Sequence, residues 1–474
     1  MKKKIVVFAY LVVCDCLAIL LCFGLAYLFR ADVLPAVFPS LRHKPVLFSA
    51  YFNKTYMLCL WIGVFLYEKL YTRRHSFWEE TRSLIKSSTI SFVLITVAVF
   101  VTKEYFYFSR VIIFTAWLLS MAILPGLRYI TKTALLRLGL WRKKVMIIGS
   151  TESTSSLIEA IKQNTIMGYE IVGCLTDEAA EVGQGISGVP ILGHFDEIEE
   201  WKKKTRFEDI IVTFPNLPRH RLVSLLKAWE AVSDTIRYIP RTGDLITTGI
   251  EIENIGKVLS LVVRKNLHKP WNIFLKTVFE YVLAVVLVIL FLPLLLVIAA
   301  AIRLDSQGAI FFRQERYGKR GKVIKVIKFR SMYTDSARRL EEYLEENPSA
   351  REEWSRYKKL KQHDPRVTRV GGFLRKYSLD ELPQLLNVLK GEMSIVGPRP
   401  YLREELEEVK QIKSILLQVK PGITGLWQTS GRSLVPFEER INIDEYYIRN
   451  WSLWLDIVIL MKTVKVTASG QGAF

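Results

Sequence analysis

Residues 273–302 read IFLKTVFEYVLAVVLVILFLPLLLVIAAAI, an apolar run with Pro293 well inside it. A helix of this length can cross the hydrocarbon core of a bilayer, which takes about 20 apolar residues. A proline, however, removes a backbone hydrogen bond and kinks a helix. Basic residues flank both ends, so charge does not decide the topology. Two interpretations stay open for this stretch alone: a spanning helix that tolerates its proline, or a re-entrant helix that bends at Leu292-Pro293 and returns to the same face.

Upstream of this run, the chain has the pattern of a four-span membrane bundle. Ile5–Leu28 is nearly all apolar and long enough to span, and no small-residue cleavage site of a signal peptide follows it. We expect three further spans at about Tyr51–Tyr71, Ser87–Val101 and Val111–Ile130. Lys and Arg gather at the N-terminus, in the second loop and after the fourth span, which predicts that both ends of the bundle are cytoplasmic. The predicted bundle covers residues 1–135.

Between residues 136 and 264 the periodicity becomes that of a Rossmann-like α/β domain. Apolar strands are expected at Val145–Gly149, Glu170–Leu175, Pro190–Gly193, Asp209–Phe214 and Thr235–Ile239. Helices are expected between them, one of which runs from about Arg219 to Val232, and this alternation implies a parallel sheet. The turn after the first strand reads GSTEST at 149–154, with one of the three glycines of a dinucleotide fingerprint, and Glu152 would repel a phosphate. We therefore expect a structural or regulatory domain rather than an NAD-binding one.

The composition combines apolarity with positive charge. Half of the 474 residues are hydrophobic, the mean hydropathy is +0.20 and the formal net charge is +20. This pairing suits basic surface laid against anionic lipid or phosphate substrates. Nucleic acid is the rival explanation, but no zinc-finger spacing or RNP-type motif is present. The cysteines form no CxxC pair and the histidines are scattered, so neither a disulfide framework nor a zinc site is expected.

Three elements of the last part of the chain follow from its pattern. Phe311–Gly318 and Gly321–Met332 predict a β-hairpin, and Asp335–Lys361 predicts one charged helix with a solvated face. Trp451–Met461 is too short to span a membrane. Its tryptophans place it either in the membrane interface or in the core of the domain.

Asp380 and Glu381 are the central acidic pair. Ser378, three residues before Glu381, has the spacing of a capping box, and acids are favoured in the first turn of a helix. The functional alternative makes one carboxylate a nucleophile toward phosphorus and the other a magnesium ligand, because oxygen ligands suit Mg²⁺ and a carboxylate can carry a phosphoryl group. Both can hold at once, since a helix N-terminus also binds phosphate.

Basic side chains around this pair suit a diphosphate. The candidates are Lys328, Arg330, Arg375, Arg399 and Arg432. A guanidinium group matches phosphate oxygens in two bonds, whereas a lysine acts as a point charge. Arg399 stands between Pro398 and Pro400, whose fixed φ angles would hold it with little entropy left to lose. Together with an acidic pair, these cations predict phosphoryl transfer.

Residues 265–474 resemble the polyprenyl-phosphate hexose-1-phosphate transferases of bacterial polysaccharide synthesis. The matching stretches are FRQERYG at 312–318, KFRSM at 328–332, DPRVT at 364–368, SLDELPQLLNVLKGEMSIVGPRP at 378–400 and KPGITGLWQ at 420–428. The bundle and the Rossmann-like domain match the large members of this family. The resemblance implies a mixed α/β, monotopic catalytic domain with a re-entrant helix at 273–302. One departure is Leu292-Pro293 at the break, where relatives often carry Ser-Pro.

The same resemblance implies the chemistry. Asp380 would attack the β-phosphate of a UDP-sugar, release UMP and carry the sugar phosphate until undecaprenyl phosphate takes it. Glu381, with Asp380, would hold Mg²⁺ or Mn²⁺. Whole-chain likeness favours galactose and an O-antigen, capsule or exopolysaccharide pathway, although glucose-using relatives share every motif. We also expect a homodimer in the bacterial inner membrane, in contact with lipid and not with nucleic acid, whose termini and catalytic domain face the cytoplasm.

Two other functions compete with this one. A membrane-bound nucleotide-sugar dehydratase also joins four spans to a Rossmann domain, but it needs an intact glycine fingerprint and a Tyr-x-x-x-Lys pair. The candidate pair, Tyr357 and Lys361, lies in the charged helix. A scaffold or chain-length regulator explains the spans, but it explains neither the acids nor the arginines.

Overall fold

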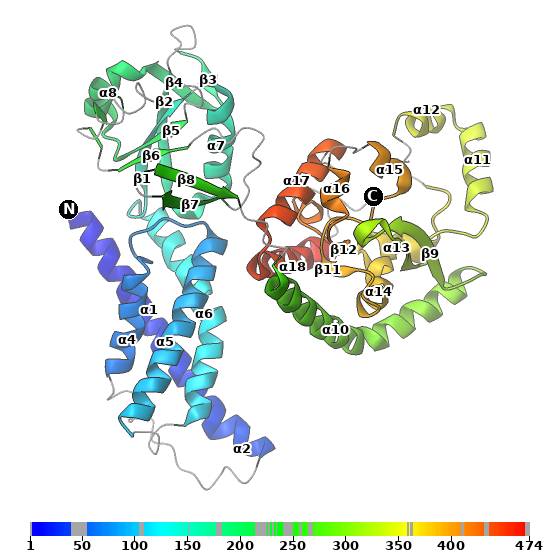
Figure 1. The fold of residues 1–474 in the computed structure, drawn as a ribbon, viewed down its shortest axis with the longest axis horizontal. Coiled ribbons are helices and arrows are strands. Elements are labelled where there is room, and N and C mark those ends of the chain that lie inside the picture. Colours follow the sequence, from blue (N-terminus) through cyan, green and yellow to red (C-terminus); the bar gives the residue numbers. More distant parts are fainter. Residues whose placement is uncertain are drawn as a thin grey trace. The chain divides into compact units, whose positions relative to one another are not determined.

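The computed structural model describes residues 2–38, 55–103, 109–149, 151–176, 183–213, 225, 228–229, 232–233, 235–239, 250–255, 258–263, 269–357, 360, 364–408, 412–430 and 436–469. The chain forms two compact units, Met1–Arg241 and Thr242–Phe474 (Figure 1). The first unit holds a helical bundle and a parallel sheet. The second holds the long apolar helix and the polar motifs.

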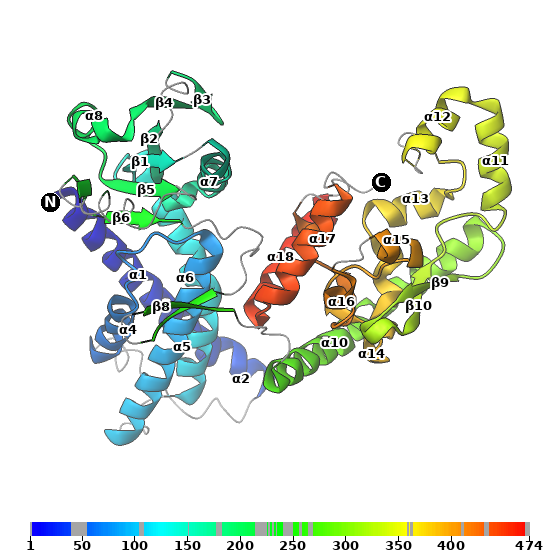
Figure 2. The same ribbon diagram turned by 45° about the horizontal axis from the view of Figure 1, so that its top comes forward.

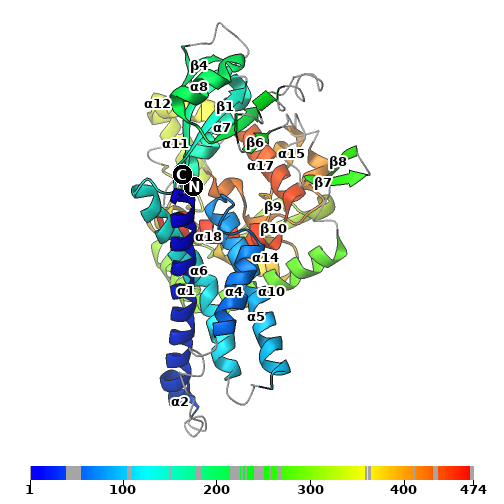
Figure 3. The ribbon, with the colours of Figure 1, turned by 90° about the vertical axis from the view of Figure 1, so that its left-hand side faces the viewer.

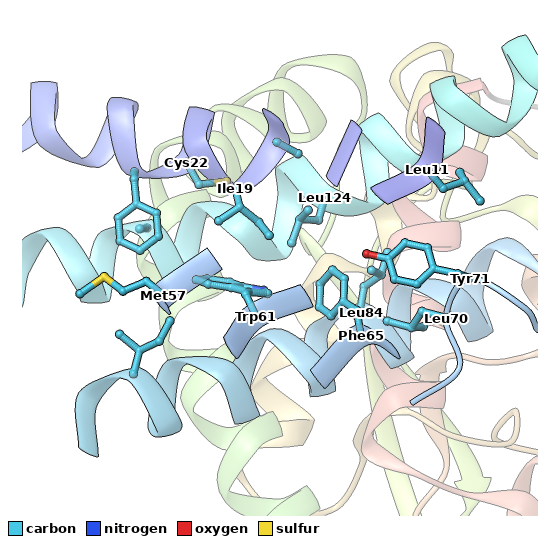
Figure 4. Close-up of a cluster of buried hydrophobic side chains, with 14 of the residues drawn as sticks. Leu11, Ile19, Cys22, Met57, Trp61, Phe65, Leu70, Tyr71, Leu84 and Leu124 are labelled. Atoms are coloured by element: carbon cyan, nitrogen blue, oxygen red, sulfur yellow. The ribbon is translucent and has the colours of Figure 1, made fainter. Parts of the chain in front are cut away.

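Four helices that run side by side build the bundle (Figure 3). They are α1 (Lys2–Leu28), α4 (Thr55–Tyr67), α5 (Phe77–Val101) and α6 (Arg110–Arg137), and α1 continues through a π-helical turn (η1, Phe29–Val33) into α2 (Leu34–Val37). Leu11, Ile19, Trp61, Phe65 and Leu124 fill the core between them (Figure 4). By length and composition α1 with its extension, α5 and α6 can each span a membrane, whereas α4 is shorter within the described residues.

Helix α5 begins earlier than expected, at Phe77 instead of Ser87. Ser76 and Glu79 form a capping box there, which supplies partners for the first backbone N–H groups. Glu80 then turns into the bundle, where its carboxylate lies 2.6 Å from the Lys132 ammonium. The apolar pattern did not predict the first turns of α5, because Glu80 in these turns is polar and is buried against Lys132.

Arg74 joins the bundle to the sheet. Its Nη1 donates hydrogen bonds to the carbonyls of Trp141, Met167 and Gly168, and its guanidinium lies 4.3 Å from the centre of the Trp141 ring. A planar cation that binds three carbonyls fixes the loop before the first strand against the loop before the second.

The sheet of the first unit has the strand order β3-β4-β2-β1-β5-β6. Its strands are β1 (Lys143–Gly149), β2 (Tyr169–Thr176), β3 (Gly185–Ile186), β4 (Val189–His194), β5 (Asp209–Thr213) and β6 (Thr235–Tyr238). All pairings are parallel except that of β3 with β4. The predicted parallel α/β sheet is therefore confirmed, with α7 (Thr151–Gln163) and α8 (Ile198–Thr205) as connections. Most of the helix expected at 219–232 lies outside the described residues.

The packing at the end of β1 explains why residue 149 is a glycine. A Cβ there would lie 1.7 Å from Oγ1 of Thr213, and Thr154 and Thr213 share a hydrogen bond of 2.9 Å between their hydroxyls. Both threonines are buried. Close packing of the helix onto the strand therefore requires this glycine.

In the second unit, helix α10 (Pro270–Asp305) is longer than the predicted 273–302 and continuous through Pro293. Figure 1 shows that it bends along its course, and we attribute the bend to this proline. A hairpin that the sequence did not predict, β7 (Ile250–Ile255) with β8 (Val258–Val263), precedes it.

The remaining elements of the second unit lie along one side of α10 (Figure 1). The predicted hairpin is confirmed as β9 (Phe311–Tyr317) paired with β10 (Val323–Phe329). The others are α13 (Arg369–Lys376), η9 (Leu379–Gln384), α14 (Leu385–Leu389), β11 (Ser394–Val396), α15 (Arg403–Glu408), α16 (Lys413–Leu416), β12 (Gly422–Thr424), η10 (Trp427–Thr429), α17 (Phe437–Asn450) and α18 (Leu453–Ser469). Strands β11 and β12 pair in parallel.

The prediction of a single charged helix at 335–361 is wrong. Two helices form, α11 (Ser336–Glu346) and α12 (Pro348–Tyr357), which extend outward from the rest of the second unit (Figures 1 and 2). Asn347 adopts an extended conformation between them. A residue before proline disfavours the helical region, while proline is well suited to start the next helix.

A buried charge network ties α10 to the core of this unit. The Lys276 ammonium donates to Glu280 Oε1 (2.8 Å), Asp456 Oδ2 (2.7 Å), Tyr447 Oη (3.1 Å) and the Val396 carbonyl (3.0 Å). Trp451 is 3% exposed, and its Nε1 donates to Asp456. The core position is therefore the correct one of the two expected for Trp451.

We predict that Lys276→Met destabilises the protein by about 3–5 kcal/mol, because it leaves two carboxylates buried without their cation. Adding Asp456→Asn should restore part of the loss. The measurement is thermal unfolding of the detergent-solubilised protein, followed by tryptophan fluorescence, with the exposed Lys322→Met as control. Equal melting temperatures for Lys276→Met and Lys322→Met would contradict this prediction.

Candidate active site

Asp380 and Glu381 lie in the first turn of the 3₁₀-helix η9, directly after Ser378. Ser378 adopts a left-handed conformation with φ of 54°, and its side chain makes no cap hydrogen bond. The capping box expected from the spacing is therefore not formed. Glu381 instead accepts a hydrogen bond of 2.6 Å from Lys328 Nζ on β10. The acidic pair is thus free of a capping role and faces a cation.

Burial raises the pKa of the Asp380 carboxyl to about 6, and the neighbouring Glu381 charge acts in the same direction. Lys328 and Arg375 oppose this shift. Arg375 comes from α13, and its Nε donates to Ser331 Oγ at 3.0 Å, which holds the guanidinium near the acid. Burial lowers the pKa of Arg375, and Asp380 partly restores it. Lys328, Arg375 and both acids thus form one electrostatic group.

Arg330 has a different place. Its Nη1 donates to the Gln307 carbonyl (2.6 Å), and its Nη2 to the Ser306 carbonyl (2.7 Å) and hydroxyl (2.9 Å). The side chain is buried and caps the C-terminal end of α10, where cations are favoured. The guanidinium of Arg330 is therefore occupied by the end of α10 rather than available to a phosphate. Arg432 lies outside the described residues.

Arg399 belongs to a second basic group, which the loop of Pro398 and Pro400 presents. The Arg399 N–H donates to Asp444 Oδ2 at 3.2 Å, and Tyr401 Oη donates to the same oxygen at 2.7 Å. Complete burial raises the pKa of the Asp444 carboxyl to about 7. The carbonyls of both prolines accept hydrogen bonds. The Pro398 carbonyl accepts one from the Gly422 N–H at 2.8 Å, and the Pro400 carbonyl accepts one from Arg316 Nη1 at 3.3 Å. The loop is fixed at both ends.

The sequence did not single out Arg316, Arg440 or Trp427. The guanidinium groups of Arg440 and Arg399 lie 4.9 and 5.9 Å from the centre of the Trp427 ring. Burial lowers the pKa of Arg316, and Arg399 lowers it further, whereas Glu405 and Glu381 raise it. Arg316 donates to the Pro400 carbonyl and lies 3.4 Å from Glu405, so it belongs with Arg399. Arg316 is paired with buried Ile324 across the hairpin, so it lies on the inward face. A charge at an inward position of the predicted hairpin was the available signal.

Comparison with known proteins assigns the family. The bacterial sugar transferase family matches residues 271–470, and a CoA-binding domain family matches residues 67–240. The UDP-galactose-lipid carrier transferase of Erwinia amylovora is 37% identical over 85% of this chain and 84% of its own length. The chain belongs to the bacterial sugar transferases. It is therefore a phosphoglycosyl transferase, and the dehydratase and scaffold alternatives are excluded.

Two further relatives support this assignment of the sugar transferase. The undecaprenyl-phosphate galactose phosphotransferase of Salmonella typhimurium is 34% identical over 85% of this chain and 84% of its own length. The UDP-glucose:undecaprenyl-phosphate glucose-1-phosphate transferase of Xanthomonas campestris is 32% identical over 69% of this chain and 67% of its own length. The relatives thus include proteins named for galactose and for glucose.

We predict that Asp380→Asn raises the stability of this transferase above pH 6. A carboxyl whose pKa rises from 3.8 to about 6 on folding stabilises the fold below pH 3.8, and this contribution is lost as pH rises through 6. A neutral amide avoids the cost of the buried charge, so we expect a gain on the order of 1 kcal/mol at pH 8, smaller at pH 5. Melting temperatures at both pH values measure it.

Glu381→Gln is the matched control, because it removes a carboxylate that is paired with Lys328. It should not stabilise the protein at pH 8. An Asp380→Asn variant that melts at or below the wild-type temperature at pH 8 would contradict the assigned cost of burial.

Proposed function

We propose that this sugar transferase moves hexose-1-phosphate, with galactose as the hexose, from a UDP-sugar to undecaprenyl phosphate, and that it releases UMP. The observation that carries the proposal is the pair of carboxyls in the first turn of η9, beside Lys328 and Arg375. A carboxylate in such a basic setting can attack phosphorus, because the cations offset the charge of the incoming diphosphate. Galactose is favoured by the names of two relatives.

In the first step an oxygen of Asp380 attacks the β-phosphorus of the UDP-sugar. The bond from the β-phosphorus to the bridging oxygen breaks, and UMP leaves with that oxygen. The sugar phosphate stays on the enzyme as an acyl phosphate. In the second step an oxygen of the polyprenyl phosphate attacks the same phosphorus and restores the Asp380 carboxylate. The product is a polyprenyl-diphosphate sugar.

The two basic groups have separate tasks in these steps. Lys328 and Arg375 act on Asp380 itself, so they lie where the transferred phosphate must pass. Arg399 stands in the loop of the two fixed prolines, and Arg316, on β9, donates to the Pro400 carbonyl of that loop. This arrangement suits the two guanidinium groups to hold the outer phosphate of the donor. Arg440 and the Trp427 ring lie beside Arg399 and offer a flat surface for the uracil base.

The carboxylate pair fits a magnesium ion. Among the residues that the structure describes, no group of three or more His, Cys, Asp and Glu side chains could hold a metal. Mg²⁺, however, is usually bound through one or two carboxylates together with substrate phosphates and water. Glu381, with Asp380, would hold it against the diphosphate. When bound, the ion supplies charge neutralisation at the leaving UMP.

We predict that Asp380→Asn abolishes UMP release, with a loss of at least about a thousandfold, because the nucleophile is gone while its shape is kept. Glu381→Gln should lose about a hundredfold or more. The measurement incubates purified enzyme and polyprenyl phosphate with a panel of UDP-sugars, and Lys322→Gln, an exposed change on the hairpin, is the control. UMP formation by Asp380→Asn near the wild-type rate would remove this residue from the nucleophile role.

We predict that turnover requires Mg²⁺ or Mn²⁺. Two carboxylates beside a diphosphate repel it unless a cation bridges them. Removal of metal with EDTA should therefore stop UMP release, and added Mg²⁺ should restore it. Full turnover in excess EDTA, with the metal content checked by elemental analysis, would contradict this.

We also propose that α10 is re-entrant, so that Lys269 and Arg313 face the cytoplasm together. UDP-sugars are made in the cytosol, and the basic groups of the site must meet them there. Single cysteines at positions 269 and 313, in a chain whose own cysteines are replaced, should both resist an impermeant thiol reagent until the cells are opened. Labelling of only one of them on intact cells would indicate a true crossing. Pro293→Ala should shift α10 toward that crossing and lower activity.

A further inference from the structure

A pocket of about 110 Å³ lies in the second unit, beside the first half of α10. Ile273, Thr277 and Tyr281, which are four residues apart on α10, form one wall. Three lysines but only one acid line it: Lys276, Lys319, Lys420 and Glu280. A water molecule needs about 10–15 Å³ of such space, so the pocket has room for a phosphate group with part of its hydration.

Two of these lysines converge without an acidic partner. Lys319 and Lys420 both line this pocket. Burial lowers the pKa of Lys319, and the charges of Arg320 and Lys420 lower it further. Lys420 Nζ lies 3.7 Å from the point that a Cβ at Gly391 would occupy, which places it against the backbone of the pocket. Within the described part of the chain, neither lysine has an ion pair. Two adjacent, partly buried cations of this kind favour an anion between them.

The other two charges of the pocket are already used. The ammonium of Lys276 has four acceptors in the buried network described above. The carboxylate of Glu280 accepts from Lys276, from the Val396 N–H (3.1 Å) and from Ser394 Oγ (2.5 Å). These two groups therefore form a fixed wall, and the net attraction for an anion comes from Lys319 and Lys420.

This pocket is separate from the candidate active site. Lys319 follows the end of β9, at the turn of the hairpin, whereas Lys328 lies at the far end of β10. The six residue steps from Lys322 to Lys328 correspond to about 20 Å of extended strand. No residue of the acidic pair or of the arginine groups lines the pocket.

The surroundings identify the anion as part of a lipid. Helix α10 has the length and apolarity of a membrane segment, and much of its first half is exposed. The exposed apolar side chains next to the pocket include Trp271, Phe274, Val278, Val282 and Val285. Tryptophan and tyrosine are favoured where headgroups meet acyl chains, and Tyr281 is both exposed and part of the pocket wall. We propose that the pocket binds the phosphate of an anionic membrane phospholipid between Lys319 and Lys420, with its acyl chains along α10.

The test titrates the full-length, detergent-solubilised protein with phosphatidylglycerol and counts bound lipid by native mass spectrometry. A basic residue near anionic lipid contributes roughly fivefold in affinity, so Lys319→Gln with Lys420→Gln should weaken binding roughly 25-fold. The control is Lys322→Gln with Lys325→Gln, an equal change of charge on exposed side chains of the same hairpin, which should shift binding less than about twofold. Phosphatidylcholine should bind weakly to all three proteins.

Three results would overturn the proposal. Equal losses in the two double variants would mean that the protein attracts lipid only through its general charge. Displacement of phosphatidylglycerol by millimolar inorganic phosphate would mean that the pocket is a free-phosphate site. Polyprenyl phosphate that displaces phosphatidylglycerol at equal concentration or below would assign the pocket to that lipid instead. Retained UMP release in the double variant at Lys319 and Lys420 verifies that the catalytic domain is folded.

Discussion

The second unit depends on the burial of one ammonium group. Lys276 sits in an apolar helix that could lie in a membrane, and a lone cation there would cost several kcal/mol. The Glu280 carboxylate of the same helix surrounds it together with a carbonyl, a phenol and a second carboxylate from three other parts of the chain. These acceptors can gather only when β11, α17 and α18 are packed on α10. The same contact that satisfies the charge therefore fixes the apolar helix to the domain that carries the acidic pair.

In the candidate active site, by contrast, a buried charge is only partly compensated by its neighbours. Asp380 is placed where burial and Glu381 disfavour its charge, and Lys328 with Arg375 only partly compensates. A carboxylate held in this way is less stabilised than one in water, which is a cost to folding. In the mechanism that we propose, the attack of this carboxylate on phosphorus also removes an unfavourable charge. Stability and reactivity at this position are thus expected to move in opposite directions, as they commonly do at functional sites.

The sequence predicted those features that depend on local pattern or on short motifs. The strands of the parallel sheet follow from short apolar runs, and the hairpin at 311–332 follows from apolar alternation. The acid pair with its basic neighbours follows from side-chain chemistry. Features that depend on distant partners were missed. Glu80 is buried in its helix, where Lys132 pairs with it, and Arg330 caps α10 through residues 23 and 24 positions away. Apart from Glu280, which lies one helical turn away, the partners of Lys276 lie 120 to 180 positions away, and no local rule connects them. Asn347-Pro348, in contrast, was a readable break in the charged helix.

The covalent intermediate on Asp380 is the central claim, and trapping it tests the account most directly. Purified enzyme is mixed with a UDP-sugar that carries radiolabelled phosphorus in the β-phosphate, without polyprenyl phosphate, and is quenched within seconds. Label should then be found on the peptide that contains Asp380, in an amount that matches the UMP released, and it should leave the protein when polyprenyl phosphate is added before the quench. An enzyme that releases UMP only when the acceptor is present, and that carries no label on that peptide, would contradict the account.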